Sequence, residues 1–210
     1  MKKMINNWYN ISIYLAGLTA LLAIFLPVTE VQKCLLASIC ILFLHFFEEF
    51  GYPGGFPLLG VKLLLGTNEM DKTKWDCNNL SSMFGNWTFL ILVYVFPLLL
   101  PNVRFLTLSA MLFLLMEVIM HSIFNLRLKS IYNAGLITAI LGLGPIGLYY
   151  FINLFDSKIY IWYDYALAVL WFIIVFIFCF RSKIYWELGK KDGYVLTDQT
   201  AFGVNQLTKN

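Results

Sequence analysis

The chain is poor in the charged residues that soluble proteins carry on their surfaces. Only 13% of its 210 residues are charged and 60% are hydrophobic, whereas a soluble domain has about 25% charged and about 45–50% apolar residues. This shortage excludes an ordinary soluble domain and indicates a membrane protein. The formal net charge of +3 is too small to indicate nucleic acid as a partner.

Cysteine and histidine are also scarce. The four cysteines, Cys34, Cys40, Cys77 and Cys179, form no CxxC pair, and three of them lie in apolar runs. We expect small apolar side chains or free thiols, not a disulfide framework. The chain has only two histidines, and both occur beside carboxylates within apolar stretches.

Long apolar stretches are abundant. A membrane-spanning helix needs about 20 mostly apolar residues, and six stretches come near that length: 10–28, 33–50, 81–100, 105–125, 134–154 and 160–180. They predict an all-α fold, a polytopic bundle of six transmembrane helices within residues 1–185. Residues 186–210 are expected to form a polar cytoplasmic tail. The first apolar run lacks a small-residue cleavage pattern, so we interpret it as a mature helix and not as a signal peptide.

Glycine and proline end the second predicted helix, in the run Gly51-Tyr-Pro-Gly-Gly-Phe-Pro. Residues 57–66 that follow are apolar but too short to cross a bilayer. They predict a short interfacial or re-entrant segment.

The basic residues predict the orientation. With six helices, one side of the membrane carries both termini and twelve basic residues, against three on the other side. The twelve are Lys2, Lys3, Lys62, Lys72, Lys74, Arg127, Lys129, Arg181, Lys183, Lys190, Lys191 and Lys209. The positive-inside rule therefore predicts a multi-pass protein of the cytoplasmic membrane with both termini in the cytoplasm.

Two polar clusters interrupt this apolar background. His45-Phe-Phe-Glu48-Glu49 lies near the end of the second predicted helix, where both carboxylates can flank the imidazole at i+3 and i+4. Glu117, His121 and Asn125 follow one another at i, i+4 and i+8 in the fourth, so they form one polar stripe. Both clusters lie toward the same predicted side of the membrane. We expect them to meet if these two helices are neighbours.

Ionisable groups at membrane depth are costly and indicate a functional site. Imidazole and carboxylate are good ligands for zinc, iron or manganese. We therefore predict a divalent metal site formed by His45, Glu48, Glu49, Glu117 and His121. Glu48 or Glu49 is expected to act as a catalytic base, and Asn125 to orient ligand or substrate.

The predicted function is a metal-dependent membrane enzyme that hydrolyses or oxidises a lipid or another hydrophobic small molecule. A metal-free acid–base isomerase or hydrophobic-ligand-binding protein is an alternative, because the same groups can transfer protons. An ion or metabolite transporter is a third, for which only Asp164 continues a polar path toward the other side. The oligomeric state is left open.

Asn133 is expected to cap the fifth helix.

The motifs resemble those of the HXXEE-domain family of small integral membrane proteins over about residues 35–150. The resemblance lies in three segments in order, His45-Phe-Phe-Glu48-Glu49 with the glycine–proline run behind it, His121-Ser-Ile-Phe-Asn125, and Tyr132-Asn-Ala-Gly-Leu-Ile-Thr138. It implies that His45, Glu48, Glu49, His121 and Asn125 are the motif residues. The family is supposed to be enzymatic because of its motif, and the resemblance implies no particular substrate.

Overall fold

The computed structural model describes residues 1–204. Within that part every regular element is a helix, and six helical segments are long and apolar enough to cross a membrane. These segments are α2 (Trp8–Phe25), α3 (Glu30–Phe50), Asn79–Leu99, α7 (Arg104–Leu128), Leu136–Leu154 and Trp162–Gly189. The predicted all-α bundle is confirmed, and the chain is a multi-pass membrane protein.

Three of the segments comprise more than one helix. Asn79–Leu99 contains α5 (Asn79–Leu90) and α6 (Phe96–Leu99), and Leu136–Leu154 contains α8 (Leu136–Thr138) and α9 (Gly144–Tyr149), each with π-helical turns beside them. Trp162–Gly189 consists of α10 (Trp162–Arg181) and α11 (Lys183–Gly189). Three short helices complete the fold: α1 (Lys2–Ile5), α4 (Phe56–Leu59) and α12 (Asp198–Phe202).

Local chemistry explains where the helices begin and end. Thr29 and Gln32 form a reciprocal capping box at the start of α3, and Asn78 and Ser81 form another at the start of α5. Each box satisfies backbone N–H groups that the first turn leaves free. α7 ends at Leu128, and the residue after it, Lys129, adopts the left-handed conformation with φ 52°.

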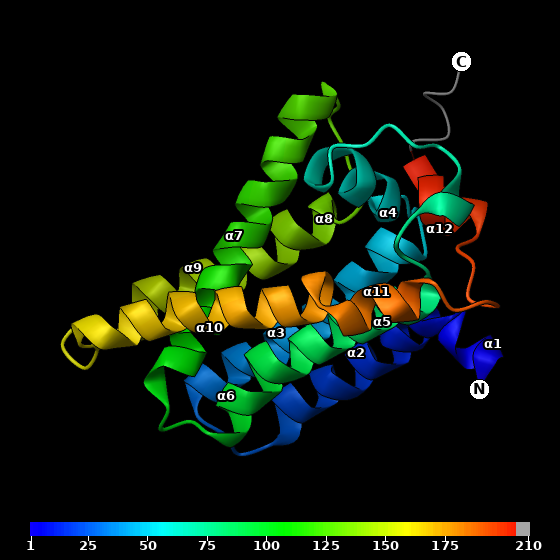
Figure 1. The fold of residues 1–210 in the computed structure, drawn as a ribbon. Helices are drawn as coiled ribbons and strands as arrows, with labels where there is room; N and C mark the ends of the chain where they lie inside the picture. Colours follow the sequence, from blue (N-terminus) through cyan, green and yellow to red (C-terminus); the bar gives the residue numbers. More distant parts are fainter. Residues whose placement is uncertain (205–210) are drawn as a thin grey trace.

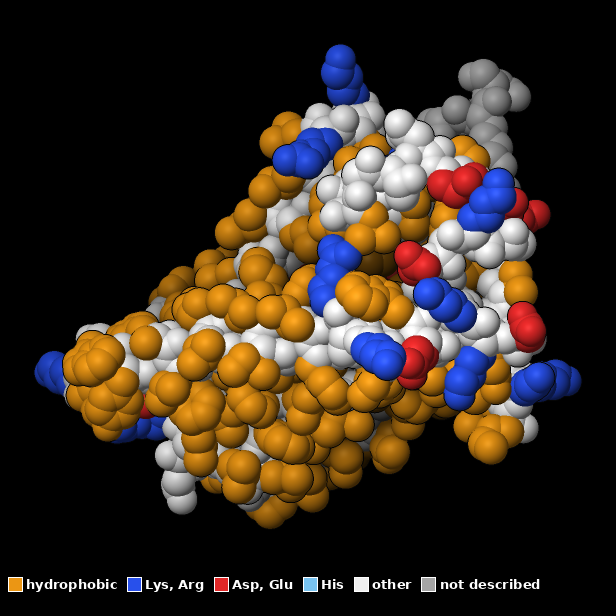
Figure 2. Space-filling view, in the orientation of Figure 1, with side chains coloured by type: hydrophobic (Ala, Val, Ile, Leu, Met, Phe, Trp, Pro, Cys, Tyr) orange, Lys and Arg blue, Asp and Glu red, His pale blue; other side chains and the backbone are white. Residues whose placement is uncertain are grey.

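The core lies where α3, α5, α7 and α10 meet, and Trp8 of α2, Tyr94 and Met111 are completely buried in it. Large apolar side chains remain on the outside along the helices. Figure 2 shows hydrophobic side chains over the length of α10 and the helices below it, with charged side chains gathered at the ends. An apolar belt between charged ends is what a bilayer requires of a spanning bundle.

The helices are not all parallel. The C-terminal part of α7 rises away from α10, and α8 lies beside it (Figure 1). The segment that begins with α8 packs against both α3 and α7. Its first turn therefore lies where the two predicted clusters approach each other.

Residues 57–66 form α4 and a further helical turn at Gly60–Leu64. This segment packs against the tail, in a small hydrophobic cluster of Leu58, Val61, Trp75, Leu196, Ala201 and Phe202. The Gly55 N–H also donates to the Thr200 carbonyl at 3.1 Å. The described part of the predicted tail, up to residue 204, is therefore packed onto the bundle. Residues 205–210 lie outside the described residues.

Candidate functional site

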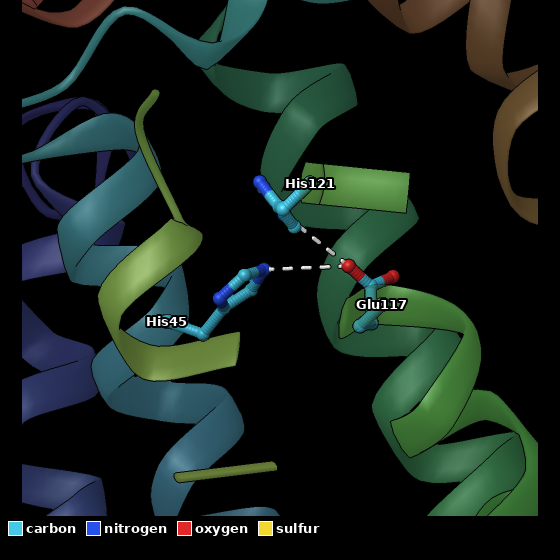
Figure 3. A group of neighbouring side chains, drawn as sticks. All are labelled: His45, Glu117 and His121. Carbon is cyan, nitrogen blue, oxygen red and sulfur yellow. Dashed lines mark ion pairs between the residues drawn. The ribbon is translucent and has the colours of Figure 1, made fainter. Parts of the chain in front are cut away.

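The side chains of the two clusters converge at one buried point. The Nε2 atom of His45 lies 3.3 Å from a Glu49 oxygen and 3.7 Å from a Glu117 oxygen. His121 Nε2 lies 3.6 Å and 3.4 Å from the same two oxygens. Figure 3 shows both imidazoles directed at Glu117. All four side chains are buried, and His121 is completely inaccessible.

The spacing of these atoms suits a metal ion. Ligands held tetrahedrally at about 2.0–2.1 Å from an ion lie about 3.3–3.4 Å from one another, and the Glu117 oxygen lies at a similar distance, 3.4 Å and 3.7 Å, from the two imidazole nitrogens. His45, Glu117 and His121 each offer a ligand atom, and these three atoms lie within 4.8 Å of one another. His121 Nε2 and one oxygen of Glu117 are buried without a hydrogen-bond partner among the described residues. Two such atoms are costly unless something binds them, so the residues fit the predicted metal.

A hydrogen-bond chain fixes the tautomer of His45. Its Nδ1 lies 2.7 Å from the Thr138 hydroxyl, and that hydroxyl donates to Glu48 at 2.5 Å. Because the carboxylate takes the only hydroxyl proton, the threonine oxygen can only accept from His45. Nδ1 therefore carries a proton, and in the neutral ring Nε2 presents its lone pair to the cluster.

His121 is held in the same way by Asn133. Its Nδ1 lies 2.6 Å from Asn133 Oδ1. The Asn133 amide donates to the His121 carbonyl at 2.8 Å and to Asn125 Oδ1 at 2.5 Å, so its oxygen is the acceptor for the ring. In the neutral ring, Nε2 of His121 then presents a second lone pair to the cluster. Hydrogen bonding of the far ring nitrogen is typical of metal-binding histidines.

Glu48 points away from this cluster, toward the start of the fifth spanning segment. One oxygen accepts from the Ile137 N–H at 3.0 Å and the Tyr132 hydroxyl at 2.8 Å. The other accepts from the Thr138 N–H at 2.8 Å in addition to its hydroxyl. A carboxylate is favourable there because the first turn of a helix has free N–H groups and a positive dipole end.

Tyr132, in the loop before α8, contributes one of these hydrogen bonds. Burial, together with the adjacent Glu48 charge, raises the pKa of Tyr132 above its ordinary value. Its hydroxyl therefore stays protonated at neutral pH, below the ordinary tyrosine value of about 10, and can donate to Glu48.

Gly135 lies directly against both imidazoles. A Cβ atom built at this position would lie 2.4 Å from His121 Cε1 and 2.8 Å from His45 Cε1. The residue also has φ +98°, a conformation that glycine adopts at little cost. Only glycine lets the backbone come this close to the two rings.

A cavity of about 300 Å³ adjoins the cluster. His45, Glu49 and Glu117 form its polar end, and phenylalanines of α3, α5, α7 and α10 form much of its wall. Arg181, Tyr185 and Trp186 also line it, at the junction of α10 and α11. Figure 2 shows the surface hollowed between α10 and the rising part of α7. The volume is at the lower limit for a small-molecule site.

The structure thus brings together four of the predicted site residues, His45, Glu49, Glu117 and His121. Glu48 and Asn125 lie outside the cluster and reach it through Thr138 and Asn133. The sequence analysis assigned no role at the histidines to Tyr132, Asn133, Gly135 or Thr138. Their signal was the Tyr132–Thr138 segment, which stands at the start of a predicted helix on the same side as both clusters. The expectation that Asn133 caps this helix is wrong, because Gly135 precedes its first turn and the Asn133 side chain bonds to His121.

The fold and the site define a multi-pass membrane protein with a buried histidine–glutamate cluster beside an apolar cavity. Residues 36–150, more than half of the chain, match the family described as "Protein of unknown function with HXXEE motif". The chain belongs to this HXXEE family, as its motifs predicted. No curated protein and no solved structure matches it.

Proposed function

We propose that this protein is a metal-dependent membrane enzyme that acts on a lipid or another hydrophobic small molecule, by hydrolysis or oxidation. The observation that carries the proposal is the pair of histidines whose Nδ1 atoms are both committed to hydrogen bonds. Their free Nε2 atoms converge with two carboxylates on one buried point. The proposed metal is zinc, iron or manganese, since two imidazoles and a carboxylate are a common ligand set for zinc and for non-haem iron.

We assign a separate role to each group of residues at the site. His45, His121 and Glu117 would hold the ion, and it would act as a Lewis acid or activate a bound water or oxygen. Glu49 lies beside both imidazoles and lines the cavity, so we assign to it the role of proton acceptor. Thr138 and Asn133 hold the rings in place. The apolar wall binds the substrate and excludes bulk water.

We further propose that the site faces the cytoplasm and that the protein resides in the cytoplasmic membrane. The support is the positive-inside rule, because the predicted side that carries the termini also carries twelve of the fifteen basic residues.

Elemental analysis of the detergent-purified protein tests the proposal. We expect about one equivalent of zinc, iron or manganese per chain, and its loss in His45→Ala and His121→Ala. Glu30→Gln is the matched control, because Glu30 is exposed and pairs with Lys33, away from the cluster. An unvaried protein without stoichiometric metal, after growth with all three metals, would refute the metal-dependent function.

A metal-free acid–base isomerase or ligand-binding protein is the second candidate, and it rests on the same contacts. If both imidazoles carry a second proton, the four N···O contacts of 3.3–3.7 Å are ion pairs that balance without a metal. This candidate predicts a co-purifying hydrophobic molecule that is lost in Glu117→Gln. The transporter has less support, because Asp164 is paired with Arg104 at 3.2 Å.

A further inference from the structure

The cavity that adjoins the cluster is also lined by a cation, Arg181, at the end of α10. This residue is half-buried. Its guanidinium makes no ion pair or hydrogen bond with another described residue. Arg104 differs from Arg181 in this respect, because it pairs with the buried carboxylate of Asp164 at 3.2 Å.

The surroundings of Arg181 suit the level of lipid headgroups. Tyr185 and Trp186 line the cavity beside it, and such amphipathic aromatics concentrate at membrane–water interfaces. Arginine binds phosphate and carboxylate groups through a planar array of N–H donors. An anionic headgroup at this position would pair with Arg181 while it stayed in contact with water.

Most of the cavity wall is apolar. Phe46, Phe89, Phe113 and Phe176 line it from four different helices. A volume of about 300 Å³ holds roughly ten groups the size of a water molecule, at about 30 Å³ each. One hydrocarbon chain of about that length fits this volume.

We propose that the cavity binds a single-chain amphiphile, with its anionic headgroup on Arg181 and its apolar chain along the phenylalanine wall toward the His45–Glu117–His121 cluster. This inference names the substrate class of the proposed enzyme and rests on that function for what happens at the cluster. The headgroup is a phosphate or a carboxylate, since the guanidinium binds both. Asp76 is the other charge at this mouth, and its carboxylate opposes an anion there.

Binding of dodecyl phosphate, dodecanoate and neutral dodecanol to the full chain in nanodiscs of zwitterionic lipid, corrected with empty nanodiscs, tests the proposal. We expect both anions to bind more tightly than dodecanol. Arg181→Gln should weaken them by about tenfold or more, since a charge-assisted hydrogen bond contributes about 1.5–3 kcal/mol, and leave dodecanol unchanged. A preference for dodecyl phosphate identifies a phosphate headgroup, and a preference for dodecanoate identifies a free carboxylic acid.

Arg127→Gln is the matched control, because Arg127 is an exposed arginine on α7 that does not line the cavity. Asp76→Asn should change affinity in the opposite direction and tighten both anions, which keeps the test valid if Arg181→Gln misfolds. Equal affinity for anions and dodecanol, or equal losses in Arg181→Gln and Arg127→Gln, would overturn the proposal.

Gly60 provides an independent test of the chain-binding part. It lines the cavity, and a Cβ added there meets no atom within 4 Å, so Gly60→Leu should fill the cavity and weaken all three probes. Gly17→Leu on α2 adds the same side chain into open space outside the cavity and should leave them unchanged. If Gly60→Leu binds as tightly as Gly17→Leu, the chain lies elsewhere. Metal content measured on the same preparations shows separately whether the proposed metal function holds.

Discussion

The Nδ1 atoms of the two histidines, which point away from the cluster, are both held by hydrogen bonds. Thr138 accepts from His45 because its own proton goes to Glu48, and Asn133 accepts from His121 because its amide group is used elsewhere. Each ring is thereby locked in orientation and tautomer before any ligand arrives. Such preorganised second contacts are a main determinant of metal affinity.

Removing these contacts should weaken metal binding without removing a ligand. We expect Thr138→Ala and Asn133→Ala each to lower metal affinity about 10–100-fold, as measured by competition with a chelator. Thr138→Ser keeps the hydroxyl and should restore affinity. Ser122→Ala is the control, because Ser122 follows His121 but bonds only to the Val118 carbonyl. Unchanged affinity in both alanine variants would show that the rings need no such support.

Alanine variants of two glycines with positive φ, Gly135 and Gly66, separate the effect of a methyl group on the imidazole rings from the effect of backbone strain. Gly135→Ala should abolish metal binding, because its Cβ would displace both imidazoles. Gly66→Ala is the control: Gly66 also has positive φ, +69°, but a Cβ there meets nothing within 4 Å. Both variants should lose about 1 kcal/mol of stability from the left-handed backbone, and only Gly135→Ala should lose the metal. Normal metal content in Gly135→Ala would contradict the geometry of the cluster.

At this scale the sequence indicates a candidate site residue where chemistry alone marks it. His45, Glu49, Glu117 and His121 stood out because ionisable groups are rare in apolar helices. It could not separate Glu48 from Glu49, since both are within reach of His45 on a helix and only the neighbouring segment decides which one turns inward. Asn133 was mistaken for a cap because asparagine favours that role, whereas its partner is twelve residues away in the chain.

At the scale of elements, the start of the fifth spanning segment organises the site. The sequence predicted that the two polar clusters meet if the second and fourth helices are neighbours. In the structure the first turn of α8 lies beside both α3 and α7, and its residues Gly135 and Thr138 contact the imidazoles. Glu48 anchors this turn through the Ile137 and Thr138 N–H groups.

Glu48→Gln should therefore act mainly on stability. It removes a charge that accepts four hydrogen bonds, so we expect a loss of about 1.5–3 kcal/mol with metal still bound. The surface variant Glu30→Gln should change stability by less than about 1 kcal/mol. Thermal unfolding in detergent, with metal analysis of the same samples, measures both effects. Complete metal loss at unchanged stability would instead make Glu48 a ligand.

The bounds of the spanning helices were predictable to within a few residues, apart from the longer α10–α11 segment, because apolar length and the flanking Gly, Pro and Asn signals determine them locally. Packing of the tail was not predictable. Leu196 and Phe202 pack in one cluster with Trp75 and Leu58. These residues are far apart in the chain, and the polar tail has no periodic pattern that predicts such long-range contacts.

For the whole molecule, the topology is the property that the sequence predicts most simply. An even number of spanning segments places both termini on one side, and the positive-inside rule predicts that this side is cytoplasmic. Protease cleavage of an N-terminal or a C-terminal tag in sealed vesicles measures this directly. We expect both tags to be cut in inside-out vesicles and both to be protected in right-side-out vesicles. Opposite behaviour of the two tags would exclude six spans.

The central claim is that one metal ion binds between α3 and α7, on residues from both polar clusters. Anomalous diffraction at the absorption edge of the metal that co-purifies with the protein tests it most directly. We predict one peak within about 2.0–2.2 Å of His45 Nε2, His121 Nε2 and a Glu117 oxygen. Metal-loaded crystals with no peak at this cluster, or with their peak elsewhere, would contradict the account.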